Sequence, residues 1–358
     1  MKNLPQYIDW FRNSSSYINA HRKKVFVVLL PGEALAHSNF NNIVHDITLL
    51  HSLGVKLVLV HGARPQINAA LEGAGIESTY HKGLRITDAI SLQIIKQIIG
   101  ALSIDVEALF SMGLANSPMH GADIKLARGN FITARPLGVL DGIDHALTGV
   151  VRKVNAMAIQ QHLDRNNIVV LSNLGYSPTG EVFNLSPEEV ATETAIALNA
   201  EKLILFIPQK GIMDSTGNMV STLSPASAQE VLTAVESHDE NKANGVAQAL
   251  NAAIKACRHN VRRSHLINFE QNGALIEELT TNHYVVAATE YRWEATFFTY
   301  LSLRTSVSYV DRDRDLGTEV NSREELLYSI GPRLTTGFLF DTRLQLDYNY
   351  STGVIRHG

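Results

Sequence analysis

The sequence predicts an α/β fold, with a mainly parallel sheet over residues 25–280 and a short antiparallel, β-rich tail over residues 281–358. Three observations support this prediction. Short runs that are apolar at nearly every position recur along the first part, as in strands buried on both faces. Amphipathic stretches of helical length alternate with these runs, which is the pattern of repeated β-α-β units. The tail changes to a period of two, which is typical of antiparallel strands.

The first element expected along the chain is a helix over residues 5–22, whose broad apolar face includes Trp10 and Phe11. A helix that precedes the first strand can pack on a neighbouring subunit or on its own domain, and both interpretations stay open. Residues 1–24 are therefore predicted to be a separate N-terminal helix and a candidate element for homo-oligomer formation.

A complete β-α-β unit follows this helix. Residues 25–30 form the first predicted strand, residues 41–53 a helix that ends at Gly54, and residues 56–60 the next strand. Because strands in such units are joined through helices, the sheet is expected to be parallel, with helices on both faces. Further helices are predicted at 65–74, 88–113, 154–165, 187–199, 224–236 and 245–258, and further buried strands at 168–171, 203–207 and 264–269.

The tail has its clearest pattern between residues 333 and 350, where nearly every even-numbered position is apolar, aromatic or Thr and most odd-numbered ones are polar. A period of two over roughly 17 residues exceeds the about 5–6 residues of an ordinary strand. Such long strands with terminal aromatic residues fit a transmembrane barrel, and a soluble antiparallel meander fits them equally well. The tail is too short to close a barrel by itself.

The composition excludes several classes of function. The chain is 45% hydrophobic and 18% charged with a net charge of −4, which does not indicate a nucleic-acid-binding surface. Its single cysteine, Cys257, excludes an intrachain disulfide and a thiolate zinc site, so no metal is expected. Residues 1–13 lack the apolar centre of a secretory signal, and no run of about 18 apolar residues predicts a spanning helix. A cytoplasmic protein without membrane association is expected.

Candidate ligand-binding residues follow the first two strands, at the edge where parallel α/β sheets bind ligands. Gly32 comes after the first strand, and the turn His61-Gly62-Ala63-Arg64 comes after the second. Small residues there let backbone N–H groups approach an anion at a helix N-terminus. Turn geometry alone also explains the glycines.

Two later positions have side chains suited to an amino-acid ligand. Arg85 directly precedes a helix, where its guanidinium can hold a carboxylate bidentately while Thr87 or Asp88 caps the helix. A solvated loop charge is the alternative for Arg85. Asn184 and Glu188 flank another helix start, where a Ser cap and a Pro in the first turn make good capping chemistry that requires no function.

Several short motifs occur in a characteristic order along residues 5–279. They are YIDWFR at 7–12, HSLG at 51–54, HGARPQI at 61–67, HK at 81–82, RITD at 85–88, GNF at 129–131, FNL at 183–185, KACR at 255–258, VRR at 261–263 and GALIEEL at 273–279. Their order resembles the amino-acid kinase fold, and within it the N-terminal domain of bacterial N-acetylglutamate synthase, an amino-acid N-acetyltransferase. The resemblance implies acetyl transfer from acetyl-CoA to glutamate, the first step of arginine biosynthesis, with feedback inhibition by arginine bound to the kinase-fold domain.

The resemblance also implies which residues contact the amino acid or effector. They are Gly32, His61, Gly62, Ala63, Arg64, Arg85, Asn184, Glu188 and Glu278. Kinase chemistry is not expected, because Leu29 and Ala249 stand where acetylglutamate kinases have phosphate-binding lysines, and Glu188 replaces their aspartate. Phosphoryl transfer relies on such charges. No catalytic residue is predicted.

The acetyltransferase part of the family binds acetyl-CoA through a loop of the form Arg/Gln-x-x-Gly-x-Gly/Ala. Its nearest approach in the tail is residues 314–319, where Glu319 would repel the pyrophosphate. No cofactor is therefore expected in this chain. The glycine-containing effector loop of arginine-sensitive relatives is also missing after Leu279, so arginine affinity is expected to be weak or absent, although Glu278 can still meet a guanidinium.

Three hypotheses follow. The favoured one is a truncated or fused synthase that keeps the amino-acid-sensing domain and lacks acetyl transfer, its tail arising from a gene fusion or from a frameshift. The second is a non-catalytic regulatory subunit of a full-length synthase. The third, an acetylglutamate kinase, is disfavoured. The expected partners are arginine, glutamate or N-acetylglutamate and further copies of the chain.

Overall fold

The computed structural model describes residue 15 and residues 18–111, 124–209, 211–213, 219–220, 223–238 and 245–280, together with the backbone of the strands between 285 and 356. The chain divides into two compact units, Met1–Glu278 and Leu279–Gly358. Most of the predicted N-terminal helix lies outside the described residues. The part of it that is described, residue 15 and residues 18–21, is helical.

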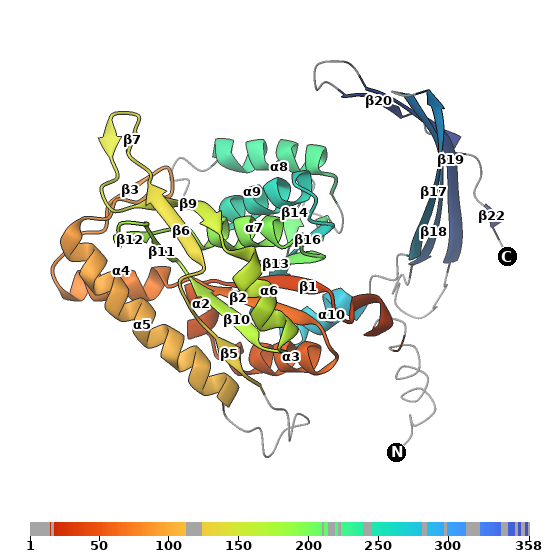
Figure 1. Ribbon diagram of the computed structural model, residues 1–358. Coiled ribbons are helices and arrows are strands. Elements are labelled where there is room, and N and C mark those ends of the chain that lie inside the picture. Colours follow the sequence, from red (N-terminus) through yellow and green to blue (C-terminus); the bar gives the residue numbers. More distant parts are fainter. Residues whose placement is uncertain are drawn as a thin grey trace, which may run out of the picture. The chain divides into compact units, whose positions relative to one another are not determined.

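The first unit is built on a six-stranded sheet in the order β16-β13-β1-β2-β10-β5, in which every pair is parallel. This arrangement confirms the predicted mainly parallel α/β fold (Figure 1). The central strands are buried on both faces, which explains their uninterrupted apolar sequences. The strands are β1 (Val25–Leu30), β2 (Lys56–His61), β5 (Leu126–Ala127), β10 (Ile168–Ser172), β13 (Lys202–Ile207) and β16 (Arg263–Asn268).

Helices cover both faces of this sheet (Figure 1). On one face, Val27 and Leu29 of β1 share a core with helices α6 (Ala156–Asp164), α7 (Pro187–Ala197) and α9 (Gly245–Arg258). Helix α8 (Pro225–His238) packs on the outer side of α9. The other face carries α3 (Phe40–Ser52), α4 (Arg64–Gly73) and α5 (Ala89–Ser111), of which α4 and α5 share an apolar cluster. All of these helices were expected from the sequence pattern.

A second sheet, in the order β12-β11-β6-β9, was not predicted. Its strands are short and only partly buried, so they lack the apolar runs of the main sheet. The bounds are β6 (Ile132–Pro136), β9 (Gly149–Val154), β11 (Leu174–Tyr176) and β12 (Val182–Asn184). The remaining described elements of this unit are three hairpins and two short helices. The hairpins are β3–β4 (Tyr80–His81, Leu84–Arg85), β7–β8 (Val139–Leu140, Ile143–Asp144) and β14–β15 (Ile212–Met213, Met219–Val220). The helices are α2 (Gly32–Ala36) and α10 (Ala274–Thr280).

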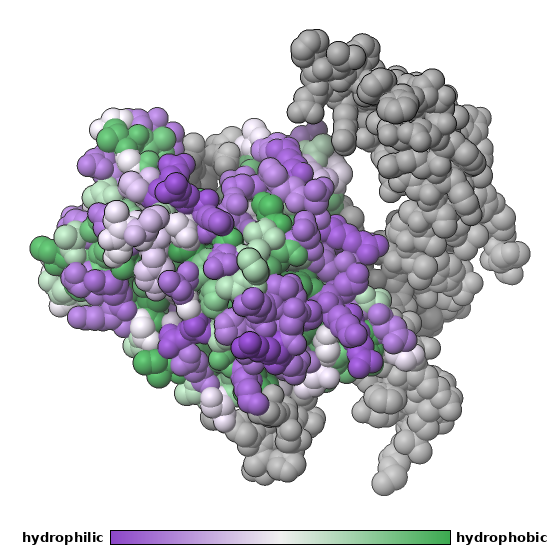
Figure 2. Space-filling view, in the orientation of Figure 1, coloured by the Kyte–Doolittle hydropathy of each residue, from purple (hydrophilic) through white to green (hydrophobic). Residues whose placement is uncertain are grey.

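Helix α5 has the length and the mean hydropathy, 1.4, of a membrane-spanning helix, although charged residues interrupt its apolar sequence. Its buried residues recur at helical spacing, from Leu92 through Ile95 and Ile99 to Val106 and Phe110, as in a core helix of a folded domain. On the visible face of the first unit, hydrophilic and hydrophobic residues are interspersed (Figure 2).

The second unit is an antiparallel sheet, in which β17 (Val285–Thr296), β18 (Thr299–Arg312), β19 (Arg323–Gly337) and β20 (Arg343–Asp347) pair in order and β21 (Tyr350–Ser351) and β22 (Ile355–Arg356) pair with β19. The expectation of one long strand over residues 333–350 is wrong, because this run is divided among β19, β20 and the first residue of β21. Leu334 pairs with Leu346 and Thr336 with Leu344. Even positions of β19 therefore pair with even positions of β20, so the alternation of the two strands is in phase.

Candidate functional site

The turns that follow β1 and β2 lie against each other. A side-chain carbon added at Gly32 would lie 2.5 Å from Gln66 Oε1 and 2.7 Å from Pro65 Cδ, and Gln66 Nε2 donates to Gly32 O at 2.7 Å. A carbon added at Gly62 would lie 3.3 Å from Pro187 Cγ at the start of α7. The structure therefore brings Gly32, Gly62 and the N-terminal end of α7 together, and glycine at position 32 is required by this close approach.

Arg85 is buried, with 7% of its surface exposed, so the alternative of a solvated loop charge is wrong. Its guanidinium donates to Ser78 Oγ at 2.5 Å and to the side-chain oxygens of Asn68 and Tyr80. These partners are uncharged, and two of the five guanidinium N–H groups have no partner among the described residues. No ion pair of Arg85 is found in this part of the chain. Burial lowers the pKa of the Arg85 guanidinium. An arginine side chain nevertheless stays protonated at neutral pH.

A second guanidinium lies on the same aromatic ring. The ring of Tyr80 has the Arg85 guanidinium carbon 4.7 Å and the Arg64 guanidinium carbon 5.7 Å from its centroid. Arg64 donates to Gly83 O at 3.3 Å and to Gln248 Oε1 at 3.0 Å, and Gln248 Nε2 donates to Gly83 O at 3.2 Å. Arg64 and Gln248 thus tie the β3–β4 hairpin to α4 and α9, and two positive charges lie near the Tyr80 ring.

Asn184 is connected to Arg85 through a buried polar network and not directly. Asn184 Nδ2 donates to Thr87 Oγ1 at 3.1 Å, and Thr148 Oγ1 lies 3.0 Å from the same oxygen. Thr148 Oγ1 also donates to the backbone oxygen of Arg85 at 2.5 Å. Asn173 Nδ2 donates to Asn184 Oδ1 at 3.0 Å. The network therefore fixes the backbone at Arg85, while the guanidinium points toward Asn68, Ser78 and Tyr80.

Glu188 lies in the first turn of α7 and accepts a hydrogen bond of 2.6 Å from Ser186 Oγ. Ser186 is the N-cap, because its side chain accepts from the backbone nitrogen of Glu189, as the capping pattern predicts. Burial raises the pKa of Glu189, whose carboxylate accepts from the backbone nitrogen of Val151 at 3.2 Å. The carboxylates of Glu188 and Glu189 thus both accept hydrogen bonds from the protein at the start of α7.

The side chain of His61 lies away from the Gly32–Gly62 turns. It is 1% exposed, and its Nε2 lies 2.8 Å from Ser103 Oγ on α5. Burial lowers the pKa of His61 to about 4. Ala63 is also buried, in the apolar cluster shared by α4 and α5. Glu278 lies in α10, and its side chain is outside the described residues.

The positions that lack the kinase lysines are apolar in the structure as well as in the sequence. Leu29 and Ala249 are 2% and 3% exposed and belong to the same hydrophobic core. A cation is therefore missing at both positions. No cluster of metal-ligating side chains occurs in the described part of the chain.

Sequence reasoning did not identify Asn68, Ser78, Tyr80 or Gln248 as neighbours of the candidate arginines. Tyr80 belongs to a strand of two residues, too short for a periodic signal, and Gln248 reaches the hairpin from more than 160 positions away in the sequence. Only the position of Tyr80 close to Arg85, on a turn with Gly83, was available as a clue.

Comparisons with known proteins agree with this architecture. Residues 24–268 match the model of the Amino acid kinase family. Amino-acid acetyltransferases of Pseudomonas fluorescens (strain SBW25) and Pseudomonas aeruginosa (strain LESB58) are 50% and 49% identical over 278 and 279 residues, which cover 78% of this chain and 63% of each relative. The matched region thus spans less than two thirds of the relatives' length.

Solved structures give a similar picture. N-acetylglutamate synthase from Neisseria gonorrhoeae, complexed with coenzyme A and N-acetyl-glutamate, is 26% identical with a TM-score of 0.70, covering 93% of this chain and 79% of that chain. The same enzyme complexed with coenzyme A and L-arginine has a TM-score of 0.69, covering 93% and 80%. Carbamate kinase from Giardia lamblia bound to AMP-PNP, at 14% identity and a TM-score of 0.53, covers 72% of this chain and 96% of that chain and shares the fold.

Proposed function

Since this chain belongs to the amino acid kinase family, we propose that its first unit is an amino-acid-binding regulatory domain of the N-acetylglutamate synthase type and not a phosphotransferase. The proposed ligand of the site around Arg85 is L-glutamate or N-acetyl-L-glutamate. The identity to amino-acid acetyltransferases over 278 residues supports the family relationship, and the site itself supports the class of ligand.

The buried guanidinium of Arg85 carries this proposal. A buried charge is costly unless an opposite charge compensates it. The partners of Arg85 in the described residues, Asn68, Ser78 and Tyr80, are all neutral. A ligand carboxylate that accepts from the remaining N–H groups would supply the missing negative charge through charge-assisted hydrogen bonds.

The second guanidinium favours a dicarboxylate over a monocarboxylate. The guanidinium carbons of Arg64 and Arg85 lie 5.7 and 4.7 Å from the centroid of the same Tyr80 ring, so the charge of Arg64 attracts the second carboxylate of a ligand bound by Arg85. Glutamate and N-acetylglutamate carry two carboxylates. Arginine is cationic and is disfavoured beside two guanidinium groups. If arginine regulates this chain, its proposed contact is Glu278 and not the site around Arg85. The related synthase has been solved with N-acetyl-glutamate and, separately, with L-arginine.

Phosphoryl transfer is disfavoured by the residues at both lysine positions. Leu29 and Ala249 are buried in apolar surroundings and cannot neutralise a transferring phosphoryl group. We also propose that the second unit does not transfer acetyl groups, because residues 281–358 contain no Gly-x-Gly/Ala loop of the acetyl-CoA-binding form.

Isothermal titration of the 358-residue protein with L-glutamate, N-acetyl-L-glutamate and L-glutamine tests the proposal. Binding of the two dicarboxylates, with weaker binding of glutamine, is expected. Arg85→Gln removes a charge-assisted contact worth about 1.5–3 kcal/mol, which corresponds to a loss of roughly 10- to 150-fold in affinity. Arg262→Gln is the matched control, because Arg262 pairs with Glu201 at the surface, at 2.9 Å. Equal affinities for glutamate and glutamine, or an Arg85→Gln protein that binds normally, would refute the proposal.

A further inference from the structure

A cavity of about 280 Å³ lies beside α5, at the carboxyl end of β10. Its lining includes Ser103 of α5, Arg128, Ile132 of β6, Ser172 of β10 and Leu174 and Tyr176 of β11. None of these residues belongs to the network around Arg85. The cavity is therefore a separate place at which a small molecule can bind, at the sheet edge where α/β folds commonly hold ligands.

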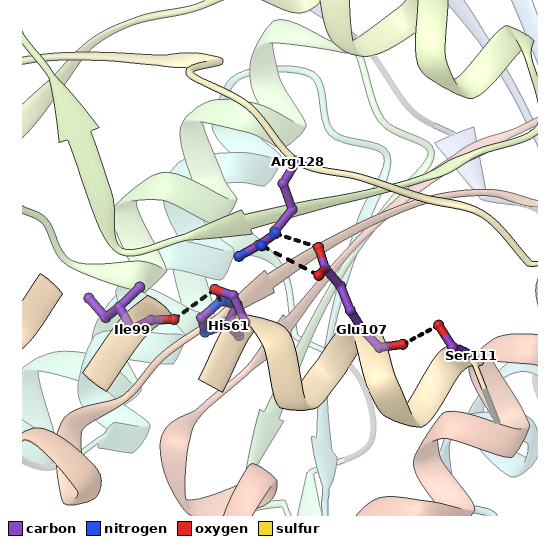
Figure 3. Close-up of polar contacts among 6 residues, drawn as sticks. His61, Ile99, Glu107, Ser111 and Arg128 are labelled. Carbon is purple, nitrogen blue, oxygen red and sulfur yellow. Dashed lines mark hydrogen bonds and ion pairs between the residues drawn. The ribbon is translucent and has the colours of Figure 1, made fainter. Parts of the chain in front are cut away.

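One ion pair supplies the charge at this cavity. Arg128 is the charged residue of the lining, and its Nε lies 2.5 Å from Glu107 Oε1 on α5, with Nη2 3.4 Å from Oε2 (Figure 3). The two side chains are 37% and 35% exposed. An ion pair with this exposure contributes little to stability, so a ligand can replace either partner at low cost. A positive and a negative group are thus both available beside the cavity.

The hydroxyl oxygen of Ser103, which lines the cavity, acts as a hydrogen-bond acceptor there. Ser103 Oγ donates to the backbone oxygen of Ile99 at 2.8 Å, which uses its single hydrogen. The hydrogen in the 2.8 Å contact with His61 must therefore come from His61 Nε2. Figure 3 shows His61 beside α5, along the same stretch of helix as Glu107. Because a hydroxyl oxygen accepts two hydrogen bonds, one acceptor position of Ser103 remains for a ligand.

We propose that this cavity binds a zwitterionic α-amino acid with an aliphatic side chain, at a site distinct from the proposed glutamate site. The carboxylate takes the place of Glu107 on Arg128. The ammonium group donates to Ser103 and to the released Glu107 carboxylate, while Ile132 and Leu174 contact the aliphatic side chain. A zwitterion supplies a donor for the open acceptor position of Ser103 and a charge-assisted hydrogen bond to Glu107, whereas a simple carboxylate supplies neither.

The position of the cavity couples it to the site around Arg85. Ser172 and Leu174 line the cavity, and Asn173 between them donates to Asn184 of the buried network. A ligand that contacts Ser172 and Leu174 therefore touches a segment shared with the first site. Binding at one site is expected to change the affinity of the other.

The test uses three probes of one carbon skeleton, namely L-leucine, 4-methylpentanoate and 3-methylbutylamine. Each is titrated at up to about 10 mM into the 358-residue protein and followed by saturation-transfer NMR. Leucine is expected to bind more tightly than either analogue. Arg128→Gln is expected to weaken leucine binding at least about tenfold, and Arg262→Gln, which removes another surface partner of a glutamate, is expected to leave it unchanged.

Glu107→Gln separates the proposed mode from simple anion binding. This change removes the ammonium partner and also frees Arg128 from its intrachain competitor. Leucine binding is therefore expected to weaken while 4-methylpentanoate binding strengthens. Absence of leucine binding, equal binding of leucine and 4-methylpentanoate, or leucine binding that Arg128→Gln leaves intact would each overturn the proposal. Failure of this proposal is distinguishable from failure of the proposed glutamate site, because Arg85→Gln leaves every lining residue of the cavity in place.

Discussion

Gly32→Ala tests whether the contact between the two glycine turns is as tight as the structure indicates. The added carbon would lie 2.5 Å from Gln66 Oε1, 2.7 Å from Pro65 Cδ and 3.0 Å from Ala63 Cα. The Gln66 amide can rotate away, but it then loses its 2.7 Å hydrogen bond to Gly32 O. Pro65 and Ala63 are fixed by the start of α4, so the turns must separate.

Overpacking of this kind costs about 1–3 kcal/mol of unfolding free energy. Gly100→Ala in the middle of α5 is the matched control, because nothing lies within 4 Å of the added carbon. There, alanine is expected to stabilise the helix by about 0.5–1 kcal/mol. The two changes add the same methyl group to helical glycines, so their opposite signs isolate the steric effect.

Urea denaturation followed by far-ultraviolet circular dichroism measures both variants against the parent protein. A double variant, Gly32→Ala with Gln66→Ala, is expected to recover only part of the loss, because Pro65 and Ala63 still oppose the added carbon. If Gly32→Ala is as stable as Gly100→Ala, the close approach of the two turns is wrong.

Three further predictions concern activity and pH. The protein is expected not to transfer phosphate from ATP to N-acetyl-L-glutamate in a coupled ADP-release assay, and turnover above background would contradict the role assigned to Leu29 and Ala249. CoA release from acetyl-CoA and L-glutamate is expected to stay at background; release that arginine lowers would show that residues 281–358 transfer acetyl groups. Burial raises the pKa of Asp46 from 3.8 to about 6. The Asp46 carboxyl therefore keeps its proton to a higher pH in the folded state than in the unfolded state. The free energy of unfolding falls as pH rises from about 4 to about 6. Asp46→Asn should remove that fall in urea titrations across this range, and an unchanged pH profile would rule out Asp46 as its source.

The main sheet was predictable because its strands are buried on both faces. The runs at 25–30 and 202–207 are apolar at almost every position for that reason, and the helices between strands keep a buried stripe. The second sheet was not predictable, since a strand such as Leu174–Tyr176 has three residues and only one of them is buried. The run at 333–350 was misread because its period of two persists through a hairpin.

The candidate site was predictable in its residue types but not in its geometry. Strand ends and a helix start identified Gly32, Gly62 and Arg85. The burial of Arg85 depends on Asn68, Ser78 and Tyr80, which local sequence does not place around it. The turn after β2 suggested a ligand contact for His61, yet its side chain points to Ser103 on α5. Directions of this kind are set by packing between elements distant in the chain.

The Arg64–Gln248–Gly83 contacts have a consequence for synthesis of the chain. Two of them join residues that are 184 and 165 positions apart and connect α9 to α4 and to the hairpin, whereas Asn68 of α4 holds the hairpin through Tyr80 and Arg85. A growing chain exposes Arg64 and the hairpin long before α9 leaves the ribosome, and contacts between such distant residues form late. During that interval the cationic side of the site is open to solvent and nothing holds the hairpin against α9. The surroundings of Arg64 are thus completed near the end of translation of the first unit, and premature release of the chain before residue 245 would leave the hairpin held by α4 alone, without its contact to α9.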